Sequence, residues 1–145
     1  MKLLIQRVSR ASVFINNSLI SEIENGLCVF IGFCKDDTEG IIEKGVKKLL
    51  NLRIFEDENN KMNKSVKDLN GEVLLISQFT LCADMNSGNR PSFDYAMKIE
   101  NANILFEKFY DLVSKEIRIK KGVFRSLMDI QLVNHGPATF VLEIK

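Results

Sequence analysis

The chain has 145 residues, of which 46% are hydrophobic and 27% are charged, and its formal net charge is +1. This length and composition suit one folded domain over residues 1–145 with a sizeable core, and they exclude a disordered chain. The balanced charge disfavours a protein that binds nucleic acid mainly through phosphates, although it leaves room for a small RNA contact.

The first half of the chain predicts four strands and one helix. Runs rich in Leu, Ile, Val and Phe predict strands over residues 2–8, 11–15, about 19–24 and 27–33. The last of these is apolar throughout, which predicts a strand buried on both faces. A helical stripe of apolar residues follows at about 38–50, after N-cap residues at 36–38.

The second half continues the same mixture. Short strands are predicted over 53–55, 73–79, 123–124, 128–133 and 138–144, with polar loops at 56–64 and 84–91. A second helix fits about 100–116, and a turn at 134–137 joins the last two strands. This order predicts an α+β fold: a curved, barrel-like, mainly antiparallel or mixed sheet with two main helices.

The sequence predicts a protein of the cytoplasm, because it shows neither a signal peptide nor a membrane span and because of its cysteine pattern. The N-terminal apolar run is too short for a signal peptide, and no stretch approaches the roughly 18 apolar residues of a membrane span. The three cysteines, Cys28, Cys34 and Cys82, are odd in number and lack C-x-x-C spacing, which argues against a disulfide framework and a zinc site. We expect Cys28 and Cys34 to be reduced core residues, and no membrane partner.

Two short motifs carry the functional signal. Ser-Gln-Phe-Thr at 77–80 ends an apolar run, and Asn-His-Gly-Pro-Ala-Thr at 134–139 opens the last one. Small polar groups at strand ends are typical of sites. The Gly136–Pro137 bond can also be cis at a cost of about 0.5–1 kcal/mol.

The residues alone leave the chemistry open. His135 is the only histidine, so any Ser-His or Cys-His nucleophile would have to use it. Ser77 and Thr80 can orient a substrate, act as nucleophiles or simply end a strand, but no base is visible beside Thr80. A hole for an oxyanion can be built from backbone N–H groups, which sequence hides. No metal-ligand cluster or Gly-rich phosphate loop is present, so we expect no metal and no cofactor.

The chain resembles the D-aminoacyl-tRNA deacylases, or D-tyrosyl-tRNA(Tyr) deacylases, over nearly its whole length. The matching segments occur in the family's order and spacing, at residues 6–13, 51–55, 71–72, 77–80, 90–93 and 134–139. The resemblance implies an enzyme, a proofreading hydrolase that cleaves the ester between a D-amino acid and the terminal adenosine of tRNA. Its partner is then the 3′ end of aminoacyl-tRNA.

The same resemblance implies a homodimer with two active sites at the subunit interface. Gly136–Pro137 would form a cis bond and reach into the partner's site, where an L side chain would strike a carbonyl oxygen. Glycine has no side chain to reject, so glycyl-tRNA is expected to be cleaved as well. Arg7 is the residue implied to hold the cis bond in place.

The resemblance also assigns the remaining site residues. Ser77, Gln78, Phe79 and Thr80 would line the pocket around the adenosine and the ester, with backbone N–H groups near Phe79 and Thr80 holding the oxyanion. The other residues implied to bind substrate are Phe124 and Met128, as an apolar wall under the adenine, with Ala102, Asn134 and Thr139. Because no base lies beside Thr80, we favour water activated by the ribose 2′-hydroxyl over a Thr80 nucleophile.

The chain departs from the family pattern in two places. His135 stands where an acidic residue is usual, and Ala138 where Val is usual, although Gly136–Pro137 is retained. Residues 125–127 (Arg-Ser-Leu) replace small residues between Phe124 and Met128, which changes the wall or adds a phosphate contact. Two alternatives therefore stay open: a related deacylase with another stereochemical preference, and a non-catalytic RNA-binding dimer.

Overall fold

A computed structural model describes residues 1–86 and 88–145; Ser87, in the predicted loop at 84–91, lies outside the described residues. The strands are β1 (Lys2–Ile15), β2 (Ser18–Ile23), β3 (Gly26–Gly32), β4 (Phe55–Glu56), β5 (Met62–Lys64), β6 (Glu72–Ser77), β7 (Ile119–Lys121) and β8 (Asp129–Glu143). The helices are α1 (Gly40–Leu50), the 3-10 helix η1 (Phe79–Cys82) and α2 (Ile99–Ser114).

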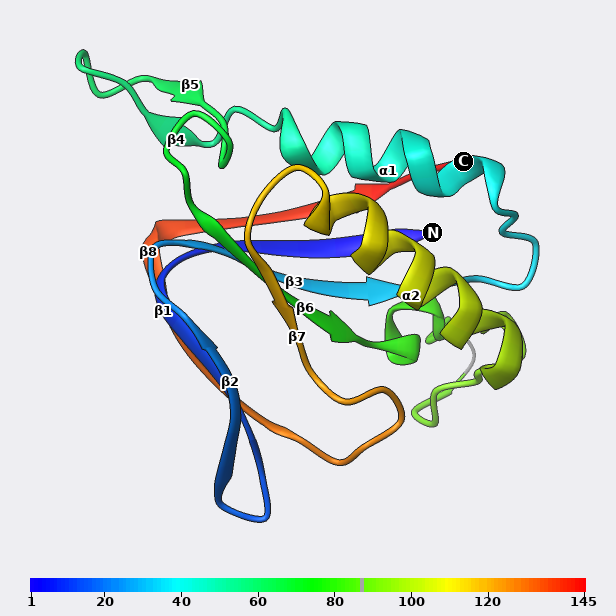
Figure 1. Cartoon of the computed structure of the whole chain (residues 1–145). Helices are drawn as coiled ribbons and strands as arrows, with labels where there is room; N and C mark the ends of the chain where they lie inside the picture. The colour runs from blue at the N-terminus through cyan, green and yellow to red at the C-terminus, as the bar shows by residue number, and fades with distance from the viewer. Residues whose placement is uncertain (87) are drawn as a thin grey trace.

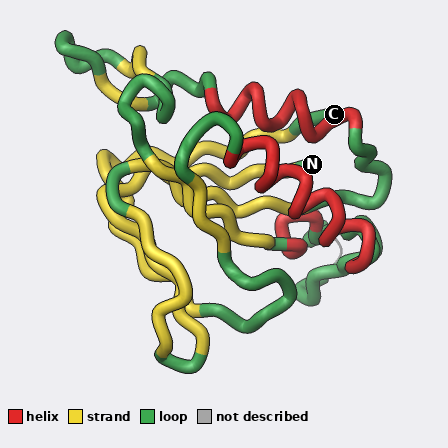
Figure 2. Tube along the Cα trace, viewed as in Figure 1, coloured by secondary structure: helices red, strands yellow, loops and turns green. Residues whose placement is uncertain are grey.

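The main sheet is mixed, curved and nearly closed, and both long helices cover the same face of it (Figures 1 and 2). Strand β1 lies in the middle and pairs antiparallel with β2, β3 and β8. Strands β3, β6 and β7 run parallel to one another, and β4 and β5 form a separate small hairpin. The predicted α+β fold with a barrel-like sheet and two helices is therefore confirmed.

The core lies on both faces of the sheet because β3 and residues 73–76 of β6 are apolar at successive positions. On β6, Val73 and Leu75 face a cluster that includes Phe106 and Phe109 of α2. The alternate residues of β6, Leu74 and Ile76, pack on the other side in a second cluster. Strand β3 is likewise buried on both faces, as its continuous apolar run predicts.

Two strand predictions were wrong in the same way. The segments 2–8 and 11–15 form one strand, β1, and the segments 128–133 and 138–144 form one strand, β8. The turn expected at 134–137 is a bulge inside β8. Val8 pairs with Asn134 and Gln6 pairs with Thr139, so residues 135–138 all lie opposite Arg7. A bulge changes the direction of a strand without ending it. The residues of this bulge are also typical of a turn, which is why the sequence predicted one.

Smaller differences occur elsewhere. Residues 123–124 form no strand, since the short strand that follows α2 is β7, and the predicted loop at 56–64 contains β5. Helix α1 begins at Gly40 without a side-chain cap. The Asp37 carboxylate instead accepts hydrogen bonds from the Met1 amino group at 2.5 Å and the Cys34 N–H at 2.6 Å. Neither long helix in the described residues is long and apolar enough to cross a membrane.

The expectation that Cys34 is a reduced thiol was also wrong. Cys34 follows β3 and forms a disulfide with Cys82 of η1, across 48 residues of sequence. The pairing of β3 with β6 places η1 beside the end of β3, a proximity that residue spacing does not reveal. Cys28 is a free, buried core residue, as expected.

Candidate active site

A pocket of about 570 Å³ opens where β6 ends, a size typical of small-molecule sites. Residues Ser77, Gln78 and Phe79 form one side of it, and the segment from Phe124 to Met128 forms the other. The remaining lining residues are apolar and come from the sheet and from the start of α2: Ile31, Phe33, Ile76, Met97, Ile99, Ala102 and Ile130.

The first motif turns sharply at the mouth of this pocket. The Gln78 backbone N–H donates to the Ile31 carbonyl at 2.7 Å, and the chain then enters η1. Gly32 makes this approach possible, since a Cβ there would lie 2.7 Å from the Gln78 carbonyl oxygen. Because η1 begins at Phe79, the first backbone N–H groups of its turn have no acceptor within the helix.

Side chains of this motif point toward solvent as well as toward the pocket. Phe79 is 57% exposed and makes an edge contact with Phe93, with ring centroids 5.0 Å apart. The Gln78 amide donates to the Thr80 hydroxyl at 2.5 Å. An exposed aromatic ring beside polar groups suits a ligand that stacks and also forms hydrogen bonds.

The opposite wall depends on close packing against β6. The Phe124 ring packs on Phe106 of α2, with centroids 5.6 Å apart. Met128 approaches β6 beside Gly122, where a Cβ would lie 2.7 Å from the Met128 sulfur and 3.3 Å from Ile76. Phe124 and Met128 therefore form the apolar part of this wall, and they attach it to both the helix and the sheet.

The second motif forms an exposed bulge, to which the buried guanidinium of Arg7 donates a hydrogen bond. Arg7 is only 4% exposed, and its Nε donates to the His135 carbonyl at 2.9 Å. Its Nη1 donates to the Ile54 carbonyl at 2.8 Å, and its Nη2 lies 3.6 Å from a Glu56 carboxylate oxygen. The Gly136–Pro137 bond is cis, and Gly136 has φ +127°. A Cβ at Gly136 would lie 2.4 Å from Arg7 Nη2, and the positive φ disfavours residues with a side chain, so glycine suits this position.

Asn134 and Thr139 lie at the two ends of the bulge and are hydrogen-bonded to each other. Asn134 accepts a hydrogen bond from the Ala138 N–H at 2.8 Å and donates to the Thr139 hydroxyl at 2.8 Å. The Thr139 hydroxyl also accepts from the Gln6 amide at 3.2 Å. Both side chains are thus engaged within the chain, and the contact with substrate that the family resemblance implies for them stays a prediction.

The structure brings together six of the predicted site residues in one pocket: Ser77, Gln78, Phe79, Ala102, Phe124 and Met128. Thr80 lies next to them on η1 but does not line the pocket. The second motif lies elsewhere in the same chain. Ser77 pairs with Ile31 of β3, and Ile31 pairs with Leu3 of β1. The bulge lies opposite Arg7, which is four residues further along β1.

Some lining residues were missed from sequence. Phe33, Met97 and Ile99 flank the pocket, but they resemble ordinary core residues because no polar group marks them. Arg125 was expected to change the wall or to add a phosphate contact, and the structure places it among the residues that line the pocket. Cys28 is excluded as a nucleophile, since burial raises the pKa of its thiol to about 12.

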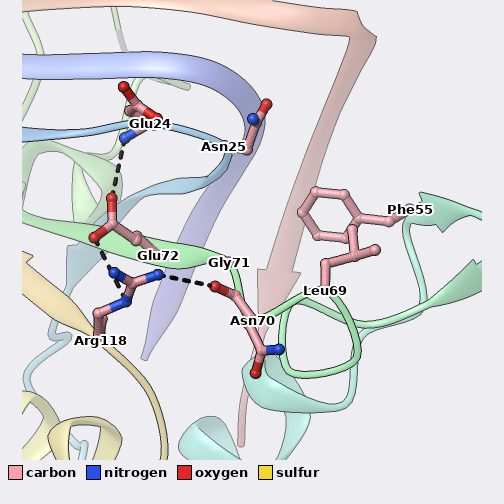
Figure 3. A pocket seen from close by; sticks show the side chains of 8 residues that line it. All are labelled: Glu24, Asn25, Phe55, Leu69, Asn70, Gly71, Glu72 and Arg118. Carbon is pink, nitrogen blue, oxygen red and sulfur yellow. Dashed lines mark hydrogen bonds and ion pairs between the residues drawn. The ribbon is translucent and has the colours of Figure 1, made fainter.

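A second pocket, of about 410 Å³, lies at the other end of β6 (Figure 3). Its polar groups are paired with one another: Glu72 accepts from the Glu24 N–H at 3.1 Å and lies 3.8 Å from Arg118. Arg118 also donates to the Asn70 carbonyl at 3.5 Å. These contacts hold the Asn70–Gly71 turn against β6, so this pocket is accounted for by the fold.

Comparison with known proteins identifies the family of the chain. Residues 4–143 match the family model described as D-Tyr-tRNA(Tyr) deacylase. D-aminoacyl-tRNA deacylases from Thermodesulfovibrio yellowstonii and Thermotoga petrophila are 50% and 46% identical, covering 98% and 99% of this chain and 98% and 97% of their own.

Solved structures share the fold of the chain. A structure described as c-Myc DNA Unwinding Element Binding Protein has a TM-score of 0.94 at 43% identity, covering 99% of this chain and 98% of its own. A probable eukaryotic D-amino acid tRNA deacylase has a TM-score of 0.84 at 17% identity, covering 97% and 98%, which shows the shared fold. By its sequence over nearly its full length, the chain belongs to the D-Tyr-tRNA(Tyr) deacylase family.

Proposed function

We propose that this D-aminoacyl-tRNA deacylase removes D-amino acids from tRNA at the pocket beside η1 and rejects L-amino acids with the bulge of a second subunit. The terminal adenosine would occupy the apolar part of the pocket, against Phe124, Met128 and Ala102. Ser77, Gln78 and Phe79 would border the ester bond. The whole of residues 1–145 would act as one deacylase domain.

One observation carries this proposal. The pocket is large enough for a nucleoside, and the Gly136–Pro137 bulge, which is exposed, lies at a different end of the same sheet. Within one chain the two motifs therefore do not form one site. A second copy that presents its bulge to the pocket would bring them together, so we infer a homodimer with composite sites.

Chiral selection would come from a steric clash that only an L side chain makes. The carbonyl oxygens of Gly136 and Pro137 would face the α-carbon of the substrate, so that an L side chain collides with them and a D side chain points away. Glycine lacks a side chain, so glycyl-tRNA is a second expected substrate. Arg7 would fix the position of the bulge, because it donates to the His135 carbonyl and occupies the space that a side chain at Gly136 would need.

The chemistry would need no side-chain nucleophile. Among the described residues, the hydrogen bond recorded for the Thr80 hydroxyl is with Gln78, and an amide is not a base. The ribose 2′-hydroxyl would help to activate water, and backbone N–H groups at the start of η1 would stabilise the oxyanion. We expect the reaction to proceed without metal or cofactor, in the cytoplasm where charged tRNA is used.

The test is deacylation of matched D-tyrosyl-tRNA and L-tyrosyl-tRNA by purified protein with a chelator present. We expect rapid loss of the D ester and retention of the L ester. Loss of both esters would instead indicate a deacylase with another stereochemical preference. Binding of tRNA without loss of either ester would contradict the proposal and favour an RNA-binding dimer.

A further inference from the structure

The pocket carries one conspicuous charge. Of the described residues that line it, Arg125 alone is charged, and the others are apolar, hydroxyl or amide side chains. Arg125 is exposed and has φ +63°, at a turn where the Ser126 N–H donates to the Val123 carbonyl at 3.2 Å. No hydrogen bond or ion pair involving its guanidinium was found within the described part of the chain, so its donors are free for a ligand.

The neighbours of Arg125 indicate which end of the ligand it meets. It directly follows Phe124 and lies three residues before Met128, and both line the apolar wall. A planar base fits such a wall, and the group that carries negative charge on a nucleotide is its phosphate. A guanidinium presents parallel N–H donors that match a phosphate, and it remains charged at any physiological pH.

The other end of the substrate is a poor match for Arg125. The carboxyl group of the amino acid is esterified and carries no charge. Its amino group is partly protonated near neutral pH, so a guanidinium beside it would be repelled. For an amino acid without an acidic side chain, the cation is therefore better matched to the nucleotide side of the ester.

We propose that Arg125 binds the phosphodiester that joins the terminal adenosine to the preceding nucleotide of the tRNA. This rests on the proposed function, in which the adenosine occupies the pocket. Arg125 is then a residue that positions the tRNA end, and its effect is confined to substrates that carry this phosphate.

The experiment compares two substrates, D-tyrosyl-tRNA and 3′-O-(D-tyrosyl)adenosine, which lacks the phosphate. For Arg125→Gln, KM for D-tyrosyl-tRNA should rise about tenfold with kcat unchanged. The slope of log kcat/KM against log salt should become shallower by about one. Hydrolysis of the adenosine ester should not change, and Arg125→Lys should restore part of the affinity.

Two control variants separate charge from shape. Arg125→Gly removes the charge at a backbone conformation that glycine adopts freely, so it should reproduce the effect of Arg125→Gln. Arg118→Gln removes an exposed arginine at the other end of β6 and should change neither KM nor the salt slope.

Each outcome decides a different point. Equal effects of Arg125→Gln on both substrates would overturn the proposal, because they would show that Arg125 shapes the wall. An unchanged KM for D-tyrosyl-tRNA would overturn it as well. If the unmodified protein cleaved neither substrate, the proposed function would be wrong, and the phosphate contact would be rejected with it.

Discussion

Arg7 shows how one buried residue can control an exposed segment. Its guanidinium binds the carbonyl groups of His135 and Ile54 and lies near Glu56. Arg7→Met keeps much of the packing volume but leaves these carbonyls without their donor, at about 1–3 kcal/mol for each group that stays buried. We expect a loss of about 2–4 kcal/mol in the free energy of unfolding. We also expect a higher rate on L-tyrosyl-tRNA relative to D-tyrosyl-tRNA.

The control for Arg7 lies on the same strand. Arg10 is exposed, so Arg10→Met should leave both the stability and the D-to-L ratio unchanged. Urea unfolding and paired deacylation assays measure the two effects. An Arg7→Met protein that is as stable and as selective as the unmodified protein would exclude the positioning role.

Thr80 distinguishes water attack from a covalent route. Its hydroxyl accepts a hydrogen bond from Gln78 and does not line the pocket. Thr80→Ala should therefore keep kcat on D-tyrosyl-tRNA within about tenfold of the unmodified value, whereas loss of a true nucleophile costs more than about a thousandfold. Thr38→Ala, at an exposed hydroxyl on the loop before α1, controls for the substitution itself. A thousandfold loss in a folded Thr80→Ala protein would restore the covalent mechanism.

At the scale of elements, the parallel pair β3–β6 positions the first motif. Gly26 pairs with Glu72 at one end of this pair, and Ile31 pairs with Ser77 at the other. A Cβ at Gly26 would lie 1.9 Å from the Glu72 carbonyl oxygen, which is backbone and has little freedom to move. Gly26→Ala should therefore lower the free energy of unfolding by about 3 kcal/mol, the upper end of what overpacking usually costs, and reduce activity with it.

Gly40 provides the matched control for Gly26. It begins α1, is exposed, and has Thr38 Oγ1, at 3.8 Å, as the nearest atom to an added Cβ. Gly40→Ala should leave stability unchanged or raise it by up to about 1 kcal/mol, because alanine favours the helix. Equal stabilities of the two variants in urea would contradict this prediction, because they would show that β3 and β6 move apart at little cost to accommodate the added methyl group.

For the whole molecule, local patterns predicted the elements better than their connections. The apolar run of β3 and the helical stripes of α1 and α2 are strong signals that packing reinforces. That β8 is one continuous strand was not predicted, because the bulge at 135–138 contains residues typical of a turn. The Cys34–Cys82 bond and the inclusion of Phe33 in the pocket depend on tertiary contacts, which spacing along one chain does not encode.

The separation of the two motifs within one chain leads to a test of the composite site. Phe79→Glu places a carboxylate at the exposed mouth of the pocket and should abolish binding of the tRNA end without unfolding the chain. Gly136→Ala forces a side chain against Arg7 and should displace the bulge, so that L-tyrosyl-tRNA is cleaved. Each variant therefore damages a different half of the proposed site.

Mixing the two variants tests whether the halves come from different subunits. In a heterodimer, the intact pocket of the Gly136→Ala subunit faces the intact bulge of the Phe79→Glu subunit. Excess Phe79→Glu protein, added under conditions of subunit exchange, should therefore suppress cleavage of L-tyrosyl-tRNA while cleavage of D-tyrosyl-tRNA persists. A bulge that acted on the pocket of its own chain would leave the L activity unchanged, because every intact pocket would still belong to a Gly136→Ala chain.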